Sequence, residues 1–229
     1  MQPLQNLSLR IFLWLAEMLR TMFEAMLRML WQCDPATARH SAAVARYARE
    51  LSCAVDCDLS ESELVHDAAL MHDIGKSRFP KHILRATRAL SALDWETVRD
   101  HPERGATLIS QFSGRGDVAE IVRCHHERID GRGYPRGLKG NEIPLASRMI
   151  SICDTYDVMT ARDSYRTPVA PVSAMVELKR VAGTQLDGDL VESFVSMLES
   201  RLLLFEHADD NDFYTELTFQ RRARHLAVV

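Results

Sequence analysis

The stretch Ala69-Leu70-Met71-His72-Asp73-Ile74-Gly75-Lys76 ends an apolar helical pattern that begins near Leu59. A capping box, with Ser60 as N-cap and Glu63 three residues later, predicts the start of this helix. Gly75 predicts its end. The polar pair His72-Asp73 therefore stands at a helix end beside a loop. An imidazole next to a carboxylate at such a place indicates a site for a divalent metal ion.

Helical periodicity continues on both sides of this stretch. Apolar residues recur at helical spacing over residues 37–52, after a break at Asp34-Pro35, and again over residues 145–162. Shorter helices are expected over residues 90–98, 105–112, 118–126, 174–181 and 190–205. No segment alternates with a period of two over a sustained length, so the predicted fold class is all-α. We divide the chain into an N-terminal helix (1–31), one helical domain (32–205) and a tail (206–229).

The composition narrows the classes of protein that remain. The chain has 229 residues, of which 46% are hydrophobic and 26% charged, so it is expected to fold around a core. Its formal charge of −4, from 28 basic and 32 acidic side chains, argues against a DNA or RNA polymer as partner. Five cysteines without a signal peptide favour a reducing, cytoplasmic location. We interpret these thiols as small buried apolar side chains.

The N-terminal stretch from Leu4 to Trp31 is unusually apolar for a helix in water. Its charged residues fall within an arc of about 80° on a helical projection: Arg10, Glu17, Arg20, Glu24 and Arg28. Its apolar face is expected to be buried, either against the main domain or in a homodimer. The sequence favours these two alternatives equally. Membrane binding ranks last, because three arginines balanced by two glutamates attract anionic lipid only weakly.

A second group of chemically active residues lies before a glycine-rich loop. His125-His126-Glu127 ends a predicted helix, and the turn-rich run of residues 130–137 follows it. A third predicted helix carries Asp154 among apolar neighbours. Two metal ions that share a carboxylate can clamp an in-line attack on phosphorus. The His-Asp pair, the His-His-Glu run and Asp154 together indicate a two-metal hydrolase.

Residues 125–135 read H-H-E-R-I-D-G-R-G-Y-P and match the pattern H-H-E-x-x-D-G-x-G-Y-P at every fixed position. The chain thus resembles the HD-GYP phosphodiesterases, a bacterial branch of the HD superfamily of metal-dependent phosphohydrolases. Three further stretches are similar to other motifs of this family: residues 34–41 (D-P-A-T-A-R-H-S), 101–105 (H-P-E-R-G) and 154–157 (D-T-Y-D). The resemblance covers residues 33 to 200, roughly the main domain.

The resemblance implies an HD-type helical bundle with extra C-terminal helices that holds divalent iron or manganese ions. The implied metal ligands are seven side chains: His40, His72, Asp73, His101, His125, His126 and Asp154. Asp73 would bridge the ions, and Lys76 would present positive charge to a phosphoryl oxygen; these two are the expected catalytic residues. Some family members bind a third ion through a glutamate where this chain has Ala36, so we expect two ions.

The resemblance also implies cyclic di-GMP as the substrate, opened to the linear dinucleotide and in some cases cleaved on to GMP. The expected substrate contacts are Lys76, Asp130, Gly133, Tyr134, Asp157 and Arg166. Tyr134 and its loop are also candidates for contact with a partner protein. Two alternatives stay open: an HD hydrolase of another nucleotide, and a signalling module without hydrolytic activity that uses this loop.

One position departs from the family pattern in charge. After the aspartate segment the family commonly reads D-R-P-Y-R, whereas residues 162–166 here read R-D-S-Y-R. Asp163 therefore stands where the family has an arginine that approaches the dinucleotide. This substitution bears on substrate affinity or identity and leaves the metal ligands unchanged.

We predict that Asp163→Arg lowers KM for cyclic di-GMP by roughly one to two powers of ten. A charge-assisted hydrogen bond is typically worth about 1.5–3 kcal/mol. A contact that is equally strong in the ground state and the transition state changes KM and not kcat. Steady-state kinetics at fixed manganese and moderate salt measure the effect, with metal content as the control. An unchanged or higher KM would contradict the prediction. Loss of activity on another nucleotide alongside a gain on cyclic di-GMP would make Asp163 a selectivity residue.

Overall fold

The computed structural model describes residues 21, 23–84, 89–112, 114–161, 167–201 and 215–216. Within these ranges every regular element is a helix, and the only strand-like pairings are isolated bridges between Asp130 and Lys139 and between Ala182 and Leu186. The predicted all-α class is confirmed.

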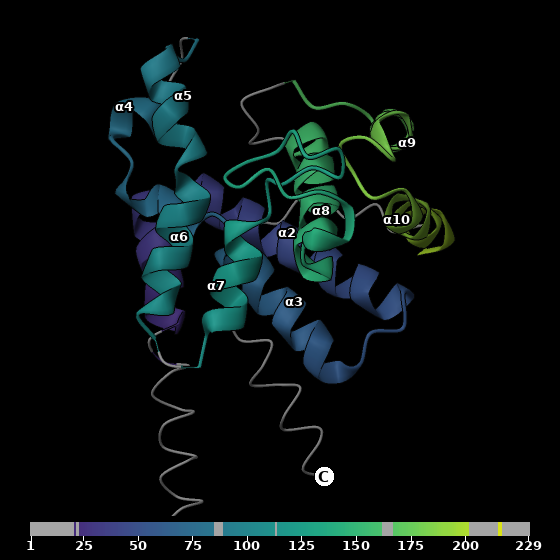
Figure 1. Ribbon diagram of the computed structural model, residues 1–229, viewed down its shortest axis with the longest axis horizontal. Helices are drawn as coiled ribbons and strands as arrows, with labels where there is room; N and C mark the ends of the chain where they lie inside the picture. The colour runs from purple at the N-terminus through teal and green to yellow at the C-terminus, as the bar shows by residue number, and fades with distance from the viewer. Residues whose placement is uncertain are drawn as a thin grey trace, which may run out of the picture.

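The helices follow one another along the chain, with a long connection that includes the glycine-rich loop between α7 and α8 (Figure 1). The α-helices with assigned bounds are α2 (Pro35–Ala54), α3 (Leu59–Met71), α4 (Lys81–Leu84), α5 (Ala92–Arg99), α6 (His101–Ser110), α7 (Gly116–Arg123), α8 (Leu145–Thr160), α9 (Pro171–Val181) and α10 (Gly188–Arg201). Two 3-10 helices, η1 (Ile74–Arg78) and η2 (Gly140–Glu142), join them, and residues 23–33 are also helical. In Figure 1, α2, α3 and α8 lie between the α6–α7 pair on one side and α9 and α10 on the other.

Helix α2 occupies the middle of the core. It packs against α3, α8 and α10, and its buried face is rich in alanine, including Ala42, Ala45 and Ala48. Small side chains let neighbouring helix backbones approach closely, while Leu51 fills the space at the far end of the helix. Because α2 also carries His40, the packing that fixes α2 fixes one side of the candidate site.

Helix α3 begins at a different cap from the one predicted. The N-cap is Asp58, whose Oδ1 accepts from the Glu61 backbone N–H at 2.8 Å, while Oε2 of Glu61 accepts from the Asp58 N–H at 2.8 Å. The pairs 58/61 and 60/63 both have capping-box spacing, and the ionised carboxylate of Asp58 is the stronger acceptor. Ser60 donates its hydroxyl to the same carboxylate at 2.8 Å instead of capping the helix.

The N-terminal segment is buried along one face in its described part. Met26, Leu27 and Leu30 belong to the hydrophobic core, whereas Arg28 and Met29 are exposed. This supports burial against the main domain for residues 23–31. Residues 1–20 and 22 lie outside the described residues, and the homodimer contact stays a prediction. Among the helices that the structure describes, none combines the length and the apolar character needed to cross a membrane.

The cysteines and the chain end differ in part from expectation. Cys124 and Cys153 are buried, but Cys53 is exposed because it faces outward on the last turn of α2.

Helix α10 is described as far as residue 201, so the predicted boundary near 205 stays a prediction. In the predicted tail only Thr215 and Glu216 are described, and Glu216 accepts a hydrogen bond from His66 Nε2 at 2.9 Å.

We predict that Leu30→Ala lowers the free energy of unfolding by about 2–5 kcal/mol, because it leaves a cavity under a fully buried side chain. Met29→Ala is the matched control on the same helical turn: its side chain is exposed, and the change should stay within about 0.5 kcal/mol. Chemical denaturation of both variants measures the difference. Equal small effects in both would mean that this helix does not belong to the core.

Candidate metal centre

The loop after α3 reaches the start of α6 only because residue 75 is glycine. A Cβ at Gly75 would collide with the His101 carbonyl oxygen and lie 2.8 Å from the Gly105 amide nitrogen. This close approach places Asp73 beside His101. Sequence reasoning gave Gly75 the role of ending α3, but α3 ends at Met71 and Gly75 lies within η1. Its structural role is tight packing between η1 and α6.

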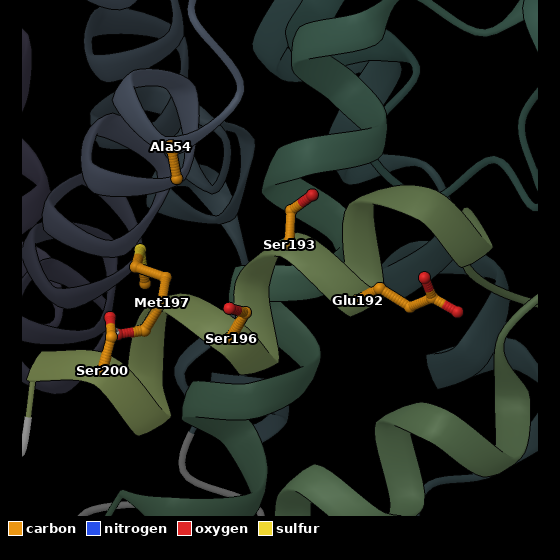
Figure 2. Close-up of a pocket in the computed structure, with 6 residues that line it drawn as sticks. All are labelled: Ala54, Glu192, Ser193, Ser196, Met197 and Ser200. Carbon is orange, nitrogen blue, oxygen red and sulfur yellow. Dashed lines mark hydrogen bonds between the residues drawn. The ribbon is translucent and has the colours of Figure 1, made fainter.

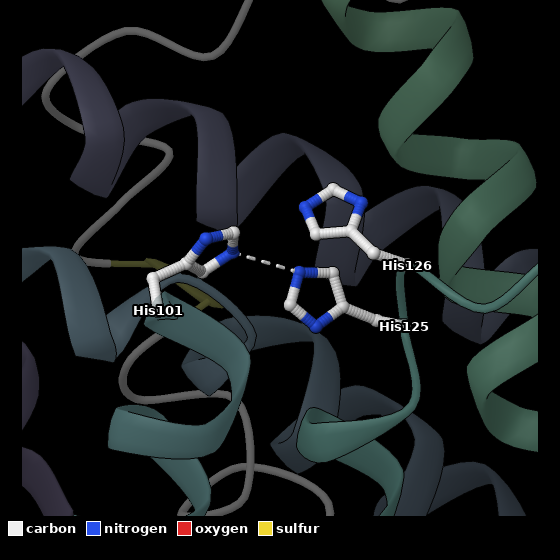
Figure 3. A group of neighbouring side chains, drawn as sticks. All are labelled: His101, His125 and His126. Carbon is white, nitrogen blue, oxygen red and sulfur yellow. Dashed lines mark hydrogen bonds between the residues drawn. The ribbon is translucent and has the colours of Figure 1, made fainter. Parts of the chain in front are cut away.

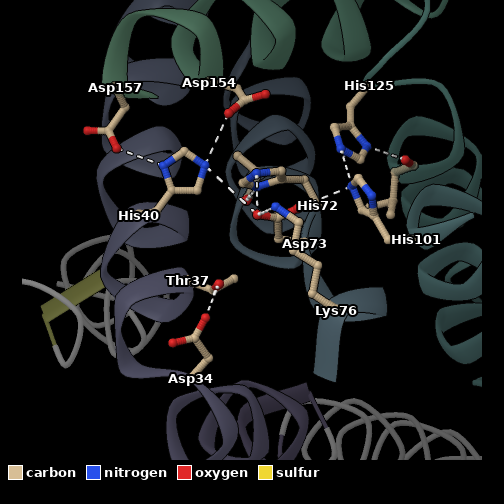
Figure 4. Close-up of polar contacts among 12 residues, drawn as sticks. Asp34, Thr37, His40, His72, Asp73, Lys76, His101, His125, Asp154 and Asp157 are labelled. Atoms are coloured by element: carbon tan, nitrogen blue, oxygen red, sulfur yellow. Dashed lines mark hydrogen bonds and ion pairs between the residues drawn. The ribbon is translucent and has the colours of Figure 1, made fainter. Parts of the chain in front are cut away.

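The first group of candidate ligands comes from α2, the end of α3 and α8. His40, His72 and Asp73 place one ligand atom each within 4.8 Å of the others. Asp154 joins them, since its Oδ1 lies 3.1 Å from His40 Nε2. Figure 4 shows Asp154 and Asp73 on the same side of the His40 ring. Four of the predicted ligands therefore converge.

The second group is formed entirely by histidines. His101 begins α6, and His125 and His126 follow Cys124, the C-cap of α7. Their ligand atoms also lie within 4.8 Å of one another, and the three rings face a common space (Figure 3). His125 and His126 have ring centroids 4.1 Å apart. The three remaining predicted ligands thus converge as well.

Asp73 connects the two groups through its two oxygens. Oδ1 lies 3.2 Å from His101 Nε2, while Oδ2 lies 3.5 Å from His72 Nε2 and 3.9 Å from His40 Nε2. Oδ2 also accepts a hydrogen bond from Lys76 Nζ at 2.6 Å. Burial opposes the charge on Asp73, but Lys76 and the neighbouring histidines hold its pKa well below the usual range. The carboxylate is therefore ionised and reaches toward both groups.

Three of the histidines are oriented by the same local contact. Nδ1 of His72, His101 and His125 lies 2.6–2.7 Å from the backbone carbonyl oxygen three residues earlier in the chain. A carbonyl oxygen can only accept, so Nδ1 must carry the proton and donate it. Each Nε2 then presents a lone pair to the site, as metal-ligating histidines do.

These lone pairs face other acceptors. His101 Nε2 and His125 Nε2 are 3.1 Å apart, and Asp73 Oδ1 lies 3.2 Å from the same His101 nitrogen. Within the part of the chain that the structure describes, Asp73 Oδ1 and His72 Nε2 are both buried without a hydrogen-bond partner. Acceptors packed against acceptors repel one another unless a cation lies among them. The donor set therefore fits divalent metal ions, which would be held by these nitrogens and carboxylate oxygens.

The protonation states agree with this chemistry for the buried histidines. Burial lowers the pKa of His72 and His125, and burial together with the neighbouring His101 lowers the pKa of His126 to about 3. These rings are neutral at pH 7, which is the form that binds metal. For His40, burial is outweighed by hydrogen bonds to Asp154 and Asp157, which raise its pKa to about 10 in the metal-free chain.

Asp157 has a different position from the one predicted. We expected a substrate contact, but its side chain is buried and its Oδ2 accepts from His40 Nδ1 at 2.7 Å. This places Asp157 on the side of the ring away from Asp154 (Figure 4). Because α8 carries both aspartates three residues apart, one contacts each ring nitrogen of His40. Asp157 orients the imidazole, a role that the D-x-Y-D spacing alone did not reveal.

The glycine-rich loop is held together by its own acidic residues. Glu127 is buried, and its carboxylate accepts from the Arg136 N–H at 2.7 Å and the Leu138 N–H at 3.0 Å, so it turns toward the loop. Asp130 pairs with Arg128 at 2.7 Å, and this hydrogen bond lowers the pKa of Asp130 to about 2. A Cβ at Gly133 would collide with the Arg128 amide nitrogen and the His126 carbonyl oxygen. Substrate contacts by Asp130 and Gly133 stay predictions.

The loop places Tyr134 beside the candidate metal-binding histidines. The Tyr134 ring packs on His126 with centroids 4.8 Å apart and an interplanar angle of 31°. Asp163 and Arg166 lie outside the described residues. A separate surface pocket beside α10 is lined by Ala54, Glu192, Ser193, Ser196, Met197 and Ser200 and contains none of the predicted site residues (Figure 2).

The fold and these two groups match a known family. The family model described as HD domain covers residues 24–190 of the chain. The chain belongs to the HD domain family, which confirms the resemblance seen in residues 125–135. Membership in this family implies dependence on divalent metal ions, in agreement with the two groups of His and Asp ligands.

The similar proteins act on cyclic dinucleotides according to their names. The chain is 33% identical over 176 residues to a 3′3′-cGAMP-specific phosphodiesterase of Vibrio cholerae, covering 76% of this chain and 32% of that protein. It is 33% identical over 147 residues to a cyclic di-GMP phosphodiesterase of Thermotoga maritima, covering 63% and 40%. The chain thus spans less than half the length of these relatives.

A solved structure shares the fold. The crystal structure of a cyclic GMP-AMP specific phosphodiesterase of V. cholerae aligns with a TM-score of 0.66 at 17% identity. The alignment covers 87% of this chain and 53% of that one, and it supports the helical architecture.

We predict a pH dependence from His40. In metal-free protein its raised pKa contributes stability that is fully present below pH 6.5, the ordinary histidine value, and is lost as pH rises through about 10. The difference in unfolding free energy between chelator-treated wild type and His40→Gln should therefore shrink steadily from pH 6.5 to pH 10. Denaturation series at several pH values measure it. A difference that stays constant over this range would contradict the assignment of the two aspartates to His40.

Proposed function

We propose that this chain is a metal-dependent phosphodiesterase that hydrolyses a cyclic dinucleotide, with cyclic di-GMP as the first candidate. The observation that carries the proposal is the ionised carboxylate of Asp73, whose two oxygens reach toward two separate ligand groups. A carboxylate shared by two ligand groups suits a pair of metal ions. Such pairs support in-line displacement at phosphorus.

The proposed reaction adds water across one phosphodiester and yields a phosphomonoester and a hydroxyl group. Bound metal ions would supply a nucleophile at neutral pH and polarise the phosphoryl oxygens. Lys76 lies at the edge of the site, only partly exposed, and Asp73 raises its pKa despite burial, so its ammonium stays charged. We propose that this ammonium stabilises the negative charge that develops on the phosphoryl group. Asp157 holds His40 in one orientation.

We propose two ions, one in each group, with Asp73 between them. The first group offers two imidazoles and the carboxylates of Asp73 and Asp154, and the second offers three imidazoles. Mixed nitrogen and oxygen donors of this kind suit iron or manganese. Ala36 supplies no donor for a third ion.

A second candidate substrate is a mixed cyclic dinucleotide. A relative named a 3′3′-cGAMP-specific phosphodiesterase covers more of this chain than the relative named for cyclic di-GMP does. Asp163, which replaces an arginine of the family pattern, is a further reason to test it. Incubating purified protein and Mn²⁺ or Fe²⁺ with each dinucleotide, and separating the products by chromatography, decides between them. No product from either would contradict the proposed function.

We predict that Asp73→Asn reduces bound metal and lowers turnover by more than about a hundredfold, since even residues that only orient a ligand are worth 10- to 100-fold. The change preserves side-chain volume and removes the charge shared by the two groups. Asp100→Asn is the control, because Asp100 is exposed and pairs only with Arg104 among the described residues. Metal analysis and initial rates are the measurements. Full metal content and wild-type turnover in Asp73→Asn would refute the bridging role.

A further inference from the structure

Arg99 lies at the edge of the metal-binding histidines although no motif includes it. It is the last residue of α5, and its side chain is exposed. Its guanidinium carbon lies 6.0 Å from the centre of the Tyr134 ring. The same ring also packs on His126, at 4.8 Å between centroids. The guanidinium therefore stands at the outer end of a stack whose inner end is a candidate metal ligand.

Among the described residues, Arg99 has no carboxylate partner. Within the described ranges no acidic side chain forms an ion pair with it, whereas nearby arginines are paired: Arg104 with Asp100 at 2.6 Å and Arg123 with Glu103 at 2.9 Å. A guanidinium resting on an aromatic ring keeps its N–H edge available for an anion. Tyr134 restricts its position in advance, so less conformational entropy is lost on binding.

A cyclic dinucleotide needs such a group because it contains two phosphodiesters. The one being hydrolysed lies at the metal ligands, and the other carries a negative charge that requires a partner nearby. In the family pattern an arginine approaches the dinucleotide from the position that is Asp163 here. The sequence thus lacks one expected cation, and the structure places another, Arg99, on the Tyr134 ring.

We propose that Arg99 binds the phosphodiester that is not being hydrolysed, with Tyr134 as the residue that positions its guanidinium. This inference rests on the proposed function and names a substrate-binding residue for it. Tyr134 acts through its ring face, so the hydroxyl is dispensable for this role. The contact is the same before and during cleavage of the other phosphodiester, so it affects KM and leaves kcat unchanged.

The test compares two substrates in the full-length, manganese-loaded protein. Arg99→Gln should raise KM for cyclic di-GMP about ten- to a hundredfold, the worth of one charge-assisted hydrogen bond, with kcat within about twofold. Bis(4-nitrophenyl) phosphate has a single phosphodiester, so its hydrolysis should not change in the variant. Arg104→Gln is the control: it removes the same charge from the next helix, α6, and should leave KM and kcat unchanged for both substrates.

Variants of Tyr134 test the positioning role. Tyr134→Leu should raise KM for cyclic di-GMP as Arg99→Gln does, and Tyr134→Phe, which keeps the ring face, should give a lower KM than Tyr134→Leu. An unchanged KM in Arg99→Gln, or an equal loss on both substrates, would overturn the inference while leaving the proposed function intact. Wild-type protein that cleaves neither cyclic di-GMP nor the single phosphodiester would overturn the proposed function, and the role of Arg99 with it.

Discussion

The buried carboxylate of Asp73 is the interaction on which the rest of the site depends. It is 1% exposed, yet its pKa is held well below the usual range, because the Lys76 ammonium lies 2.6 Å from Oδ2. An isolated charge in that position would be very unfavourable, so the elements that carry its partners must meet there. Helix α2, the end of α3, η1 and the start of α6 are held together at this point, and the same packing forms the core.

The orientation of the histidines arises from helix ends. The last carbonyl groups of a helix have no partner within the helix, and a histidine just beyond the end can donate its Nδ1 proton to one of them. His72 and His125 do this after α3 and α7, and His101 does it at the junction of α5 and α6. One local contact therefore sets both the tautomer and the direction of the ring, and it leaves Nε2 for a metal ion.

The glycine-rich loop shows how a motif can serve structure and chemistry together. Glu127 and Asp130 satisfy backbone and arginine donors inside the loop, and Gly133 allows the chain to return against residues 126–128. These contacts place the Tyr134 ring against His126, with the Arg99 guanidinium 6.0 Å from its centre. Tyr134 therefore lies beside the candidate ligands because of hydrogen bonds made elsewhere in the loop.

The helices and most candidate ligands can be predicted from the sequence. The helices follow from local periodicity, and the ligands stand within short motifs. The 3.6-residue periodicity predicts the helices, and His72-Asp73, His125-His126 and Asp154 stand out at helix ends or among apolar neighbours. The helix cap at Asp58 was missed because two overlapping pairs have the same spacing, and a local rule does not choose between them.

Contacts between distant residues were decided only by the tertiary structure. Asp157 turned toward His40, 117 residues away in sequence, because α8 packs on α2 with that register. The approach of Gly75 to the His101 carbonyl oxygen and of Arg99 to Tyr134 depends on how η1 and α5 pack against α6. Periodicity tells which face of a helix is buried, but the partner of that face depends on how all the helices fill one core.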